Sequence, residues 1–232
     1  TPPQGLGRIA LGGCFIGTVA GVHLATLVFA AVLNSHHTLS LWSVYMLLLS
    51  FFHASEFLVT AKYRPRDVSF QSFLLDDGLA YRVAVLASWV EFWLEVTFLP
   101  SLKSWAWVSV VGFIMTVGGQ YIRAAAMWTA KQSFSHHIAE EKQDEHVLIT
   151  HGVYKYLRHP SYFGWFWWAI GLQIMLCNPV CVILYAITAS YFFKRRVPYE
   201  EYYLRQLFPE EYAAYMQSTP TIGIPGVSGI EA

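Results

Sequence analysis

The chain has 232 residues, of which 55% are hydrophobic and only 13% are charged, and its mean hydropathy is +0.40. Soluble domains carry about 25% charged residues, so this composition excludes a disordered chain and argues against a soluble globular enzyme. Fifteen basic residues balance fifteen acidic ones, so the chain lacks the excess of positive charge that is typical of nucleic-acid-binding proteins. Three cysteines are too few for a disulfide-built secreted fold. The composition therefore predicts an integral membrane protein.

Four long apolar stretches come first along the chain. Residues 9–33 and 104–122 contain no Asp, Glu, Lys or Arg, whereas residues 39–61 and 78–99 are apolar with a few polar groups. A transmembrane helix needs about 20 apolar residues, so each stretch is long enough for one span. The alternative for the first stretch is a cleavable signal sequence. Its length, and the lack of a basic cluster before it, argue against that alternative.

The last apolar stretch, residues 161–193, is 33 residues long without one charge. A single helix of that length would measure about 50 Å, whereas the hydrocarbon core of a bilayer is about 30 Å thick. Asn178-Pro179 lies near the middle of the stretch, and proline there blocks continuation of the helix. We therefore expect a helical hairpin, and with it an all-α, polytopic membrane fold of about six transmembrane helices.

Lys and Arg gather in alternate connections between the expected helices. Residues 62–77, residues 123–158 and the tail after residue 193 hold most of them, whereas residues 34–38 and 177–181 hold none. An excess of basic residues marks cytoplasmic loops, so we expect both termini on the cytosolic side. An even number of spans agrees with that orientation. The expected layout is a single domain, 1–232, with four spans in 1–130, a cytosolic segment at 131–160, the hairpin at 161–193 and a cytosolic segment at 194–232.

The two cytosolic segments carry the polar motifs. Arg158 and His159 come directly before Pro160, which suits the first turn of a helix because its missing N–H costs nothing there. The free N–H groups of such a turn, with the two basic side chains, predict a site for an anionic or polar ligand at the membrane surface. The alternative is a basic interfacial anchor with tyrosines and tryptophans in the aromatic belt.

Several motifs together carry a resemblance to a known family. They are the Arg-His-Pro-Ser-Tyr of residues 158–162, the Ser-Phe-Leu-Leu of 72–75, the Ala-Met of 126–127 and the Glu-Glu-Tyr of 210–212. With these motifs the chain resembles the isoprenylcysteine carboxyl methyltransferases over nearly its full length. The resemblance implies a multi-pass enzyme of the endoplasmic reticulum membrane. It would use S-adenosyl-L-methionine to methylate the C-terminal prenylcysteine, farnesylated or geranylgeranylated, of processed CaaX proteins.

The resemblance also implies site residues. Arg196 would meet the substrate carboxylate and serve as the catalytic residue. Family members often have Gln where this chain has Ala139, so a cofactor contact there must use the main chain. Pro198 lies between Arg196 and Glu200, so an unbroken helix that places both side chains on one face cannot be assumed. The implied cofactor-binding residues are Ala139, His146, Val147, Leu148, Ile149, Tyr154, His159, Pro160, Ser161, Tyr162 and Glu200.

The chemistry of the implied reaction fits an arginine. A prenylcysteine carboxylate has a pKa near 3.5 and is ionised at pH 7, so no general base is required. Arg holds a carboxylate bidentately and stays charged at any working pH. Three alternatives remain open. They are a phospholipid N-methyltransferase, whose amine substrate has no use for an arginine clamp, an NADPH-dependent sterol reductase, and a transporter or lipid receptor without turnover. A surface ion pair is the alternative reading of Arg196 and Glu200.

Other polar groups are assigned structural roles. Glu91 with Glu95, and His53 with Glu56, lie within expected spans, where helix-to-helix hydrogen bonding is the default and lining of a prenyl access route is the alternative. Gly118-Gly119 predicts close helix packing. The histidines and cysteines show no zinc-ligand spacing, so no metal is expected. For Cys177 and Cys181 we favour free thiols over a lumenal disulfide.

Overall fold

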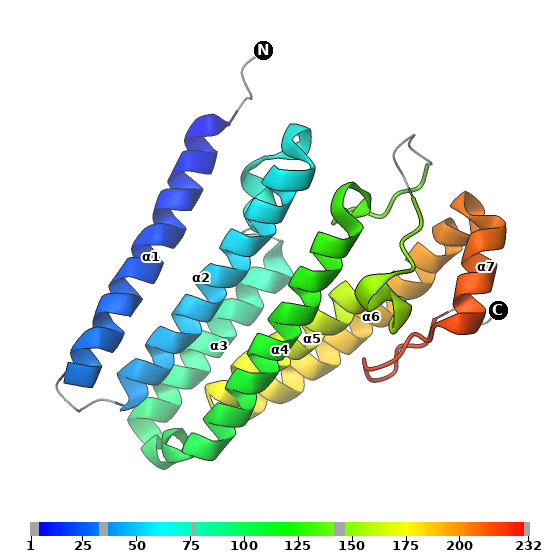
Figure 1. The fold of residues 1–232 in the computed structure, drawn as a ribbon. Coiled ribbons are helices and arrows are strands. Elements are labelled where there is room, and N and C mark those ends of the chain that lie inside the picture. Colours follow the sequence, from blue (N-terminus) through cyan, green and yellow to red (C-terminus); the bar gives the residue numbers. More distant parts are fainter. Residues whose placement is uncertain (1–4, 33–36, 76–77, 142–146, 230–232) are drawn as a thin grey trace. The chain divides into compact units, whose positions relative to one another are not determined.

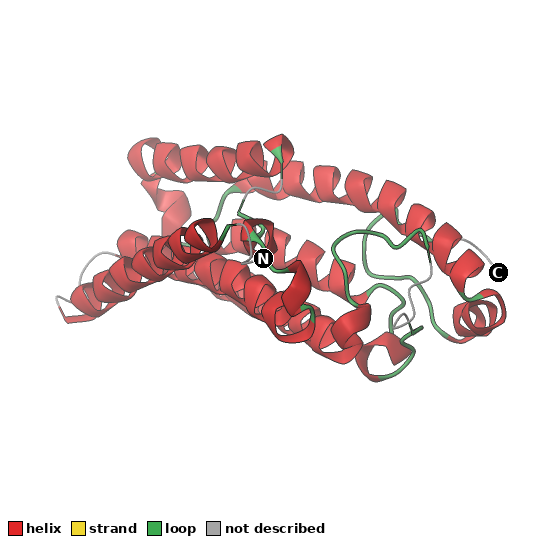
Figure 2. Ribbon diagram, turned by 90° about the horizontal axis from the view of Figure 1, so that it is seen from above, coloured by secondary structure: helices red, strands yellow, loops and turns green. Residues whose placement is uncertain are grey.

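The computed structural model describes residues 5–32, 37–75, 78–141 and 147–229. Within these residues the chain is helical, with loops and no strand (Figures 1 and 2). The α-helices are α1 (Leu6–Val32), α2 (His37–Tyr63), α3 (Leu79–Phe98), α4 (Ala106–Ala130), α5 (Pro160–Met175), α6 (Pro179–Leu207) and α7 (Pro209–Ser218). Short 3-10 turns are Pro65–Asp67, Phe70–Phe73, Pro100–Ser104, Lys131–Ser133 and Gly152–Lys155. The all-α prediction is confirmed.

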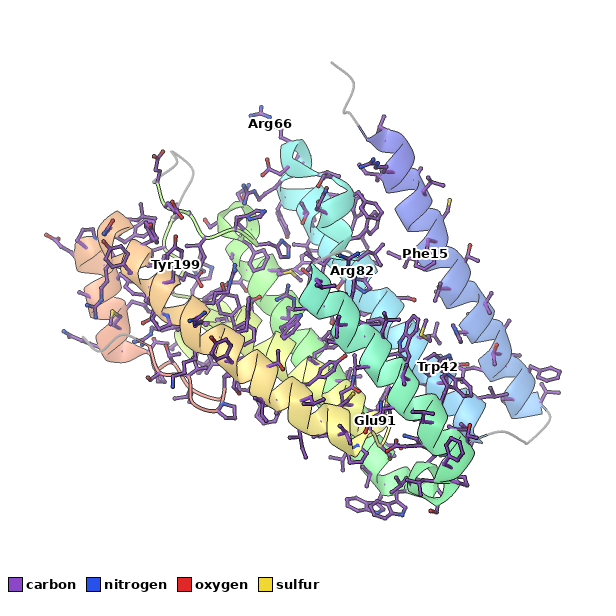
Figure 3. All side chains as sticks on the ribbon, turned by 180° about the vertical axis from the view of Figure 1, so that it is seen from behind. Phe15, Trp42, Arg66, Arg82, Glu91 and Tyr199 are labelled. Carbon is purple, nitrogen blue, oxygen red and sulfur yellow. The ribbon has the colours of Figure 1, made fainter. Side chains whose placement is uncertain are left out.

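Three helices of the described chain are long and apolar enough to cross a membrane, namely α1, α2 and the helix that starts at Ala106. α1 exposes large apolar side chains around much of its surface, such as Phe15 at 60% and Leu11 at 70% exposed (Figure 3). Apolar side chains around a whole helix are typical of a membrane span. α3 carries Arg82 and two glutamates and α5 has only 16 residues, so the count of six spans stays a prediction.

The chain forms two compact units, one made of residues 1–114 and 171–182 and the other of residues 115–170 and 183–232. In the first unit α1 packs along α2, and the turn Phe70–Phe73 lies against both helices. Gly12 of α1 leaves room for the Phe73 ring, which stacks on Phe57 of α2 at 4.2 Å between centroids. His53 binds the same turn, because its Nδ1 lies 2.8 Å from the Phe73 carbonyl oxygen.

The α5–α6 hairpin turn, which the Asn178-Pro179 pair predicted, belongs to the first unit. The Glu91 carboxylate of α3 accepts hydrogen bonds from the backbone N–H groups of Val180 and Cys181, both at 2.7 Å, and so caps the start of α6 (Figure 3). The buried Lys103 ammonium donates to Glu95 at 2.5 Å and to the Asn178 amide oxygen at 2.9 Å. Glu91 and Glu95 of α3 therefore bond to neighbouring elements, in agreement with the default expectation of hydrogen bonding.

In the second unit α4 and α5 touch through glycines. A Cβ on Gly119 would lie 2.5 Å from the backbone nitrogen of Trp168, and one on Gly164 would lie 2.6 Å from the backbone nitrogen of Arg123. The two helices thus approach backbone to backbone, which side chains at these positions would prevent. Gly118 points into open space, so only the second glycine of the predicted pair makes the contact.

α6 runs unbroken from Pro179 to Leu207 with Pro198 inside it. The proline removes one backbone hydrogen bond, to the carbonyl of Lys194, yet the helix continues on both sides. Arg196 and Glu200 therefore do lie one turn apart on a single helix. α7 starts at Pro209, and its first turn carries Glu210 and Glu211, which favour the positive end of the helix dipole.

Candidate active site

A pocket opens in the second unit, among the segments before α5, the later half of α6 and α7. Its cavity volume is about 130 Å³, and the space out to and including its open mouth is about 910 Å³. The segment at residues 133–139 forms one wall, and the segment at 147–149 forms another. The lining is mixed: Ser161, His159 and Glu200 are polar, whereas Leu148, Leu204 and Phe208 are apolar.

The pocket brings together the residues that the resemblance implies for a cofactor. His146 lies outside the described residues. Arg196 does not line the pocket, but it bonds to Tyr162, which does. Ten implied cofactor residues line the pocket: Ala139, Val147, Leu148, Ile149, Tyr154, His159, Pro160, Ser161, Tyr162 and Glu200.

Further lining residues escaped the sequence-based prediction. Leu204 follows Glu200 by four residues, so the two share one face of α6, and Phe208 lies directly after the end of α6. Tyr212 and Tyr215 continue the wall on α7 and form a buried cluster with Phe208. The helical spacing that starts at Glu200 is the signal that identifies Leu204.

His159 lies between two carboxylates. Its Nε2 is 3.0 Å from Glu201 Oε1, and its Nδ1 is 3.5 Å from Glu200 Oε2. Burial alone would lower the pKa of this imidazole, but the two carboxylates outweigh burial and raise the pKa of His159 to about 9. The ring is therefore a cation at neutral pH; its Nε2–H donates to Glu201, and its Nδ1 lies within ion-pair distance of Glu200 without a hydrogen bond.

Glu200 is the acidic residue of the pocket, and its side chain is half-buried. Burial acts to raise the pKa of its carboxyl group, but bonds from His159 and Tyr162 and the charge of Arg196 lower it overall, so the group is ionised. Its Oε2 is buried and has no hydrogen-bond partner among the described residues. A buried carboxylate oxygen in that state is suited to accept from a ligand hydroxyl or ammonium group.

Arg196 uses one edge of its guanidinium within the protein. Nε donates to the Tyr162 hydroxyl at 2.8 Å, and Nη2 donates to the His136 carbonyl oxygen. In the described part of the chain Nη1 makes no hydrogen bond, so the edge between Nη1 and Nη2 can still hold a carboxylate. Next to it on α6, Arg195 lies exposed over the Tyr191 ring.

Arg158 is engaged differently from the expectation of a ligand-binding cation. Its Nε lies 3.0 Å from Glu201 Oε1 and 2.8 Å from Thr221 Oγ1, and its Nη1 donates to the carbonyl oxygens of Met216 and Thr219. Its charge is thus balanced inside the protein by Glu201. Of the two basic side chains before Pro160, His159 is the one that the pocket places beside Glu200.

Comparison with known proteins agrees with this fold. The model of the isoprenylcysteine carboxyl methyltransferase family matches residues 110–206. The protein-S-isoprenylcysteine O-methyltransferase of Homo sapiens is 47% identical over 97% of this chain and 76% of its own length. That of Dictyostelium discoideum is 43% identical over 82% of this chain and 79% of its own length.

The fold has a solved counterpart. The structure of a eukaryotic intramembrane Ras methyltransferase, an isoprenylcysteine carboxyl methyltransferase, matches with a TM-score of 0.91 and 38% identity, covering 99% of this chain and 80% of that one. Identity at this level over nearly the whole chain shows common descent as well as a common fold. The chain belongs to the isoprenylcysteine carboxyl methyltransferase family and is a membrane-embedded methyltransferase.

Proposed function

We propose that this enzyme transfers a methyl group from S-adenosyl-L-methionine to the C-terminal carboxylate of S-prenylated cysteine in CaaX-processed proteins. The proposal places the reaction at the cytosolic face of the endoplasmic reticulum membrane, with both termini of this chain in the cytosol. The observation that carries it is the position of Arg196 one helical turn from Glu200, joined to the pocket through Tyr162.

The pocket fits the proposed cofactor by the chemistry of its lining. Beside the His159 imidazolium, Glu200 offers a buried carboxylate oxygen that accepts no hydrogen bond among the described residues, and this oxygen suits the amino group or the ribose hydroxyls. Leu148, Leu204 and Phe208 offer an apolar wall for the adenine ring. When bound, the cofactor supplies an electrophilic methyl group on a positively charged sulfur.

The role of the chain's own residues is to position the two reactants. The substrate carboxylate is already ionised, so no residue has to remove a proton from it. Arg196 holds the carboxylate along its Nη1–Nη2 edge, while Tyr162 and the His136 carbonyl fix the other edge. Orientation of both reactants in one site then supplies much of the rate. The prenyl chain stays in the lipid bilayer or among the apolar helices.

Incubation of the purified protein in lipid nanodiscs with S-farnesylcysteine and cofactor labelled in its methyl group tests the proposal. We expect label in a base-labile methyl ester of the prenylcysteine and none in phosphatidylethanolamine. Label in phosphatidylethanolamine alone would replace the proposal with the phospholipid N-methyltransferase. Competition by NADPH, but not by S-adenosylhomocysteine, for the pocket would replace it with the sterol reductase.

A further inference from the structure

Glu201 is the neighbour of Glu200 on α6, yet its side chain faces another set of partners. It is fully buried, at 0% exposed. Its Oε1 lies 3.0 Å from His159 Nε2, 3.0 Å from Arg158 Nε and 3.1 Å from Thr221 Oγ1. A buried carboxylate is stable only when donors of this kind compensate its lost hydration. One oxygen atom thus connects α6 with the residues before α5 and with the segment after α7, all in the second unit.

Two of these partners connect to the segment at residues 219–229, which follows α7 and is called the strap below (Figure 1). The Arg158 backbone N–H donates to the Pro220 carbonyl oxygen at 3.2 Å, and its side chain donates to Thr221. Gly229 lies so close to Arg158 and to the Glu201 carboxylate that a Cβ there would clash with both. The strap therefore encloses the Arg158–Glu201 ion pair.

His159 separates the cofactor pocket from the strap. On one side its ring lines the pocket beside Glu200, and on the other it lines a small enclosed cavity that Thr221, Ile222 and Ile224 help to form. Its ring also lies parallel to that of Tyr162, with centroids 5.5 Å apart. The orientation of the imidazole is thus fixed by Glu200, by Tyr162 and, from the strap side, by Glu201.

The charges along this path alternate in sign. Glu200 is followed by His159, then Glu201, then Arg158, so two carboxylates and two cations balance one another in a buried row. Removal of Glu201 would leave Arg158 and the imidazolium with one carboxylate between them. It would also free the side of the ring that faces the strap.

We propose that Glu201 is a positioning residue, which holds His159 in its orientation within the cofactor pocket and couples that orientation to the strap. The inference rests on the proposed function in one respect, because the ligand of the pocket is the cofactor named there. The strap thereby belongs to the working site, although none of its residues lines the cofactor pocket.

Glu201→Gln is the variant that tests this role, since it keeps the shape of the side chain and removes its charge. The imidazole then loses one of its two carboxylates and releases its proton at a lower pH than in the wild type. The neutral ring is held less strongly from the strap side, because an amide oxygen is a weaker acceptor than a carboxylate, and it neutralises Glu200 less well. Within this row, the charged groups around His159 are Glu200, Glu201 and Arg158. The charged and titratable groups that surround the row are Tyr154, Tyr162, Arg196 and Tyr212.

The measurement is binding of S-adenosylhomocysteine to the purified full chain in nanodiscs, by calorimetry from pH 6 to pH 8.5. We expect the wild type to bind almost equally over this range. For Glu201→Gln we expect affinity about tenfold weaker at pH 8.5 than at pH 6. Glu210→Gln, an exposed change on α7, is the matched control and should behave as the wild type.

A second readout requires no ligand. Hydrogen exchange of the strap amides should speed up in Glu201→Gln and, to a smaller extent, in Thr221→Val, which removes one donor without changing any charge. Thr221→Val should also weaken S-adenosylhomocysteine binding, by two- to fivefold.

The inference is overturned if Glu201→Gln shows the affinity, pH profile and strap exchange of Glu210→Gln. It is also overturned if Glu201→Gln unfolds while Thr221→Val changes neither binding nor strap exchange. Failure of the wild type itself to bind S-adenosylhomocysteine would contradict the proposed function. The strap exchange would still decide whether Glu201 holds the strap.

Discussion

Arg196 and Tyr162 are joined in two ways. The guanidinium Nε donates to the phenol oxygen at 2.8 Å, and the central guanidinium carbon lies 5.4 Å from the centroid of the same ring. A hydrogen bond and a cation–π contact to one side chain fix the rotamer of a long, flexible arginine. Tyr162 also lines the pocket. The same side chain therefore contacts the arginine proposed to bind the substrate and forms part of the proposed cofactor site.

The first prediction concerns the guanidinium itself. Arg196→Lys should lose at least tenfold in kcat/KM for S-farnesylcysteine, because an ammonium cannot bond Tyr162, His136 and a carboxylate in one plane. Arg195→Lys is the matched control, since its side chain is exposed over Tyr191, and it should change kcat/KM less than twofold. Equal, mild effects of the two substitutions would show that the cluster serves only as a topological anchor.

A second prediction tests whether Glu200 and Tyr154 belong to the proposed cofactor site. Glu200→Ala should weaken S-adenosylhomocysteine binding about tenfold or more, because it removes the buried carboxylate oxygen that accepts no hydrogen bond from the described part of the chain. Tyr154→Ala should also weaken binding, because it removes a wall of the pocket. Calorimetry checks both, with Glu210→Ala on exposed α7 as the control. Unchanged affinity in both variants would exclude these residues from the site.

The raised pKa of His159 predicts a pH dependence of stability. Its pKa is about 9 when folded against 6.5 for a free imidazole, so its contribution is fully present below pH 6.5 and is lost as pH rises through about 9. That contribution is at most about 3 kcal/mol. The difference in thermal midpoint between wild type and His159→Gln should therefore shrink from pH 6.5 to pH 9.5. The same series with the exposed His151→Gln should show no such trend, and a constant gap for His159→Gln would contradict the assignment.

A pair of neighbouring glycines provides the fourth prediction. Gly119→Ala places a methyl group against the backbone of α5, and both backbones would have to move apart. Overpacking of this kind costs about 1–3 kcal/mol, so the thermal midpoint should fall by several degrees. Gly118→Ala points into open space and should leave the midpoint unchanged or slightly higher, since Ala favours the helix. Indistinguishable midpoints for the two variants would contradict the backbone contact of α4 with α5.

The helical hairpin shows what local sequence can predict. The length of residues 161–193 and the Asn178-Pro179 pair placed the turn correctly, because hydrocarbon thickness and the missing proline N–H are local constraints. The same proline rule applied to Pro198 left the continuity of α6 open. The structure shows that packing on both sides of one lost hydrogen bond keeps the helix whole.

The partners of Arg158 were beyond prediction for a different reason. Besides Glu201 on α6, they are Met216 near the end of α7 and Thr219 and Thr221 in the strap, about sixty positions further along the chain. No local pattern indicates where such a segment packs. Leu204, by contrast, lay within reach of prediction, since a four-residue spacing from Glu200 identifies it once α6 is taken as continuous.

The occupied edge of Arg196 has a consequence for the end of each catalytic cycle under the proposed function. Tyr162 and the His136 carbonyl hold Nε and Nη2 whether or not substrate is present, so the guanidinium does not need to rearrange when the substrate changes. Esterification converts a negatively charged carboxylate into a neutral group, and the attraction between two opposite charges disappears at that moment. The arginine then holds the product far less strongly than the substrate, so the methylation itself promotes release of the ester into the bilayer.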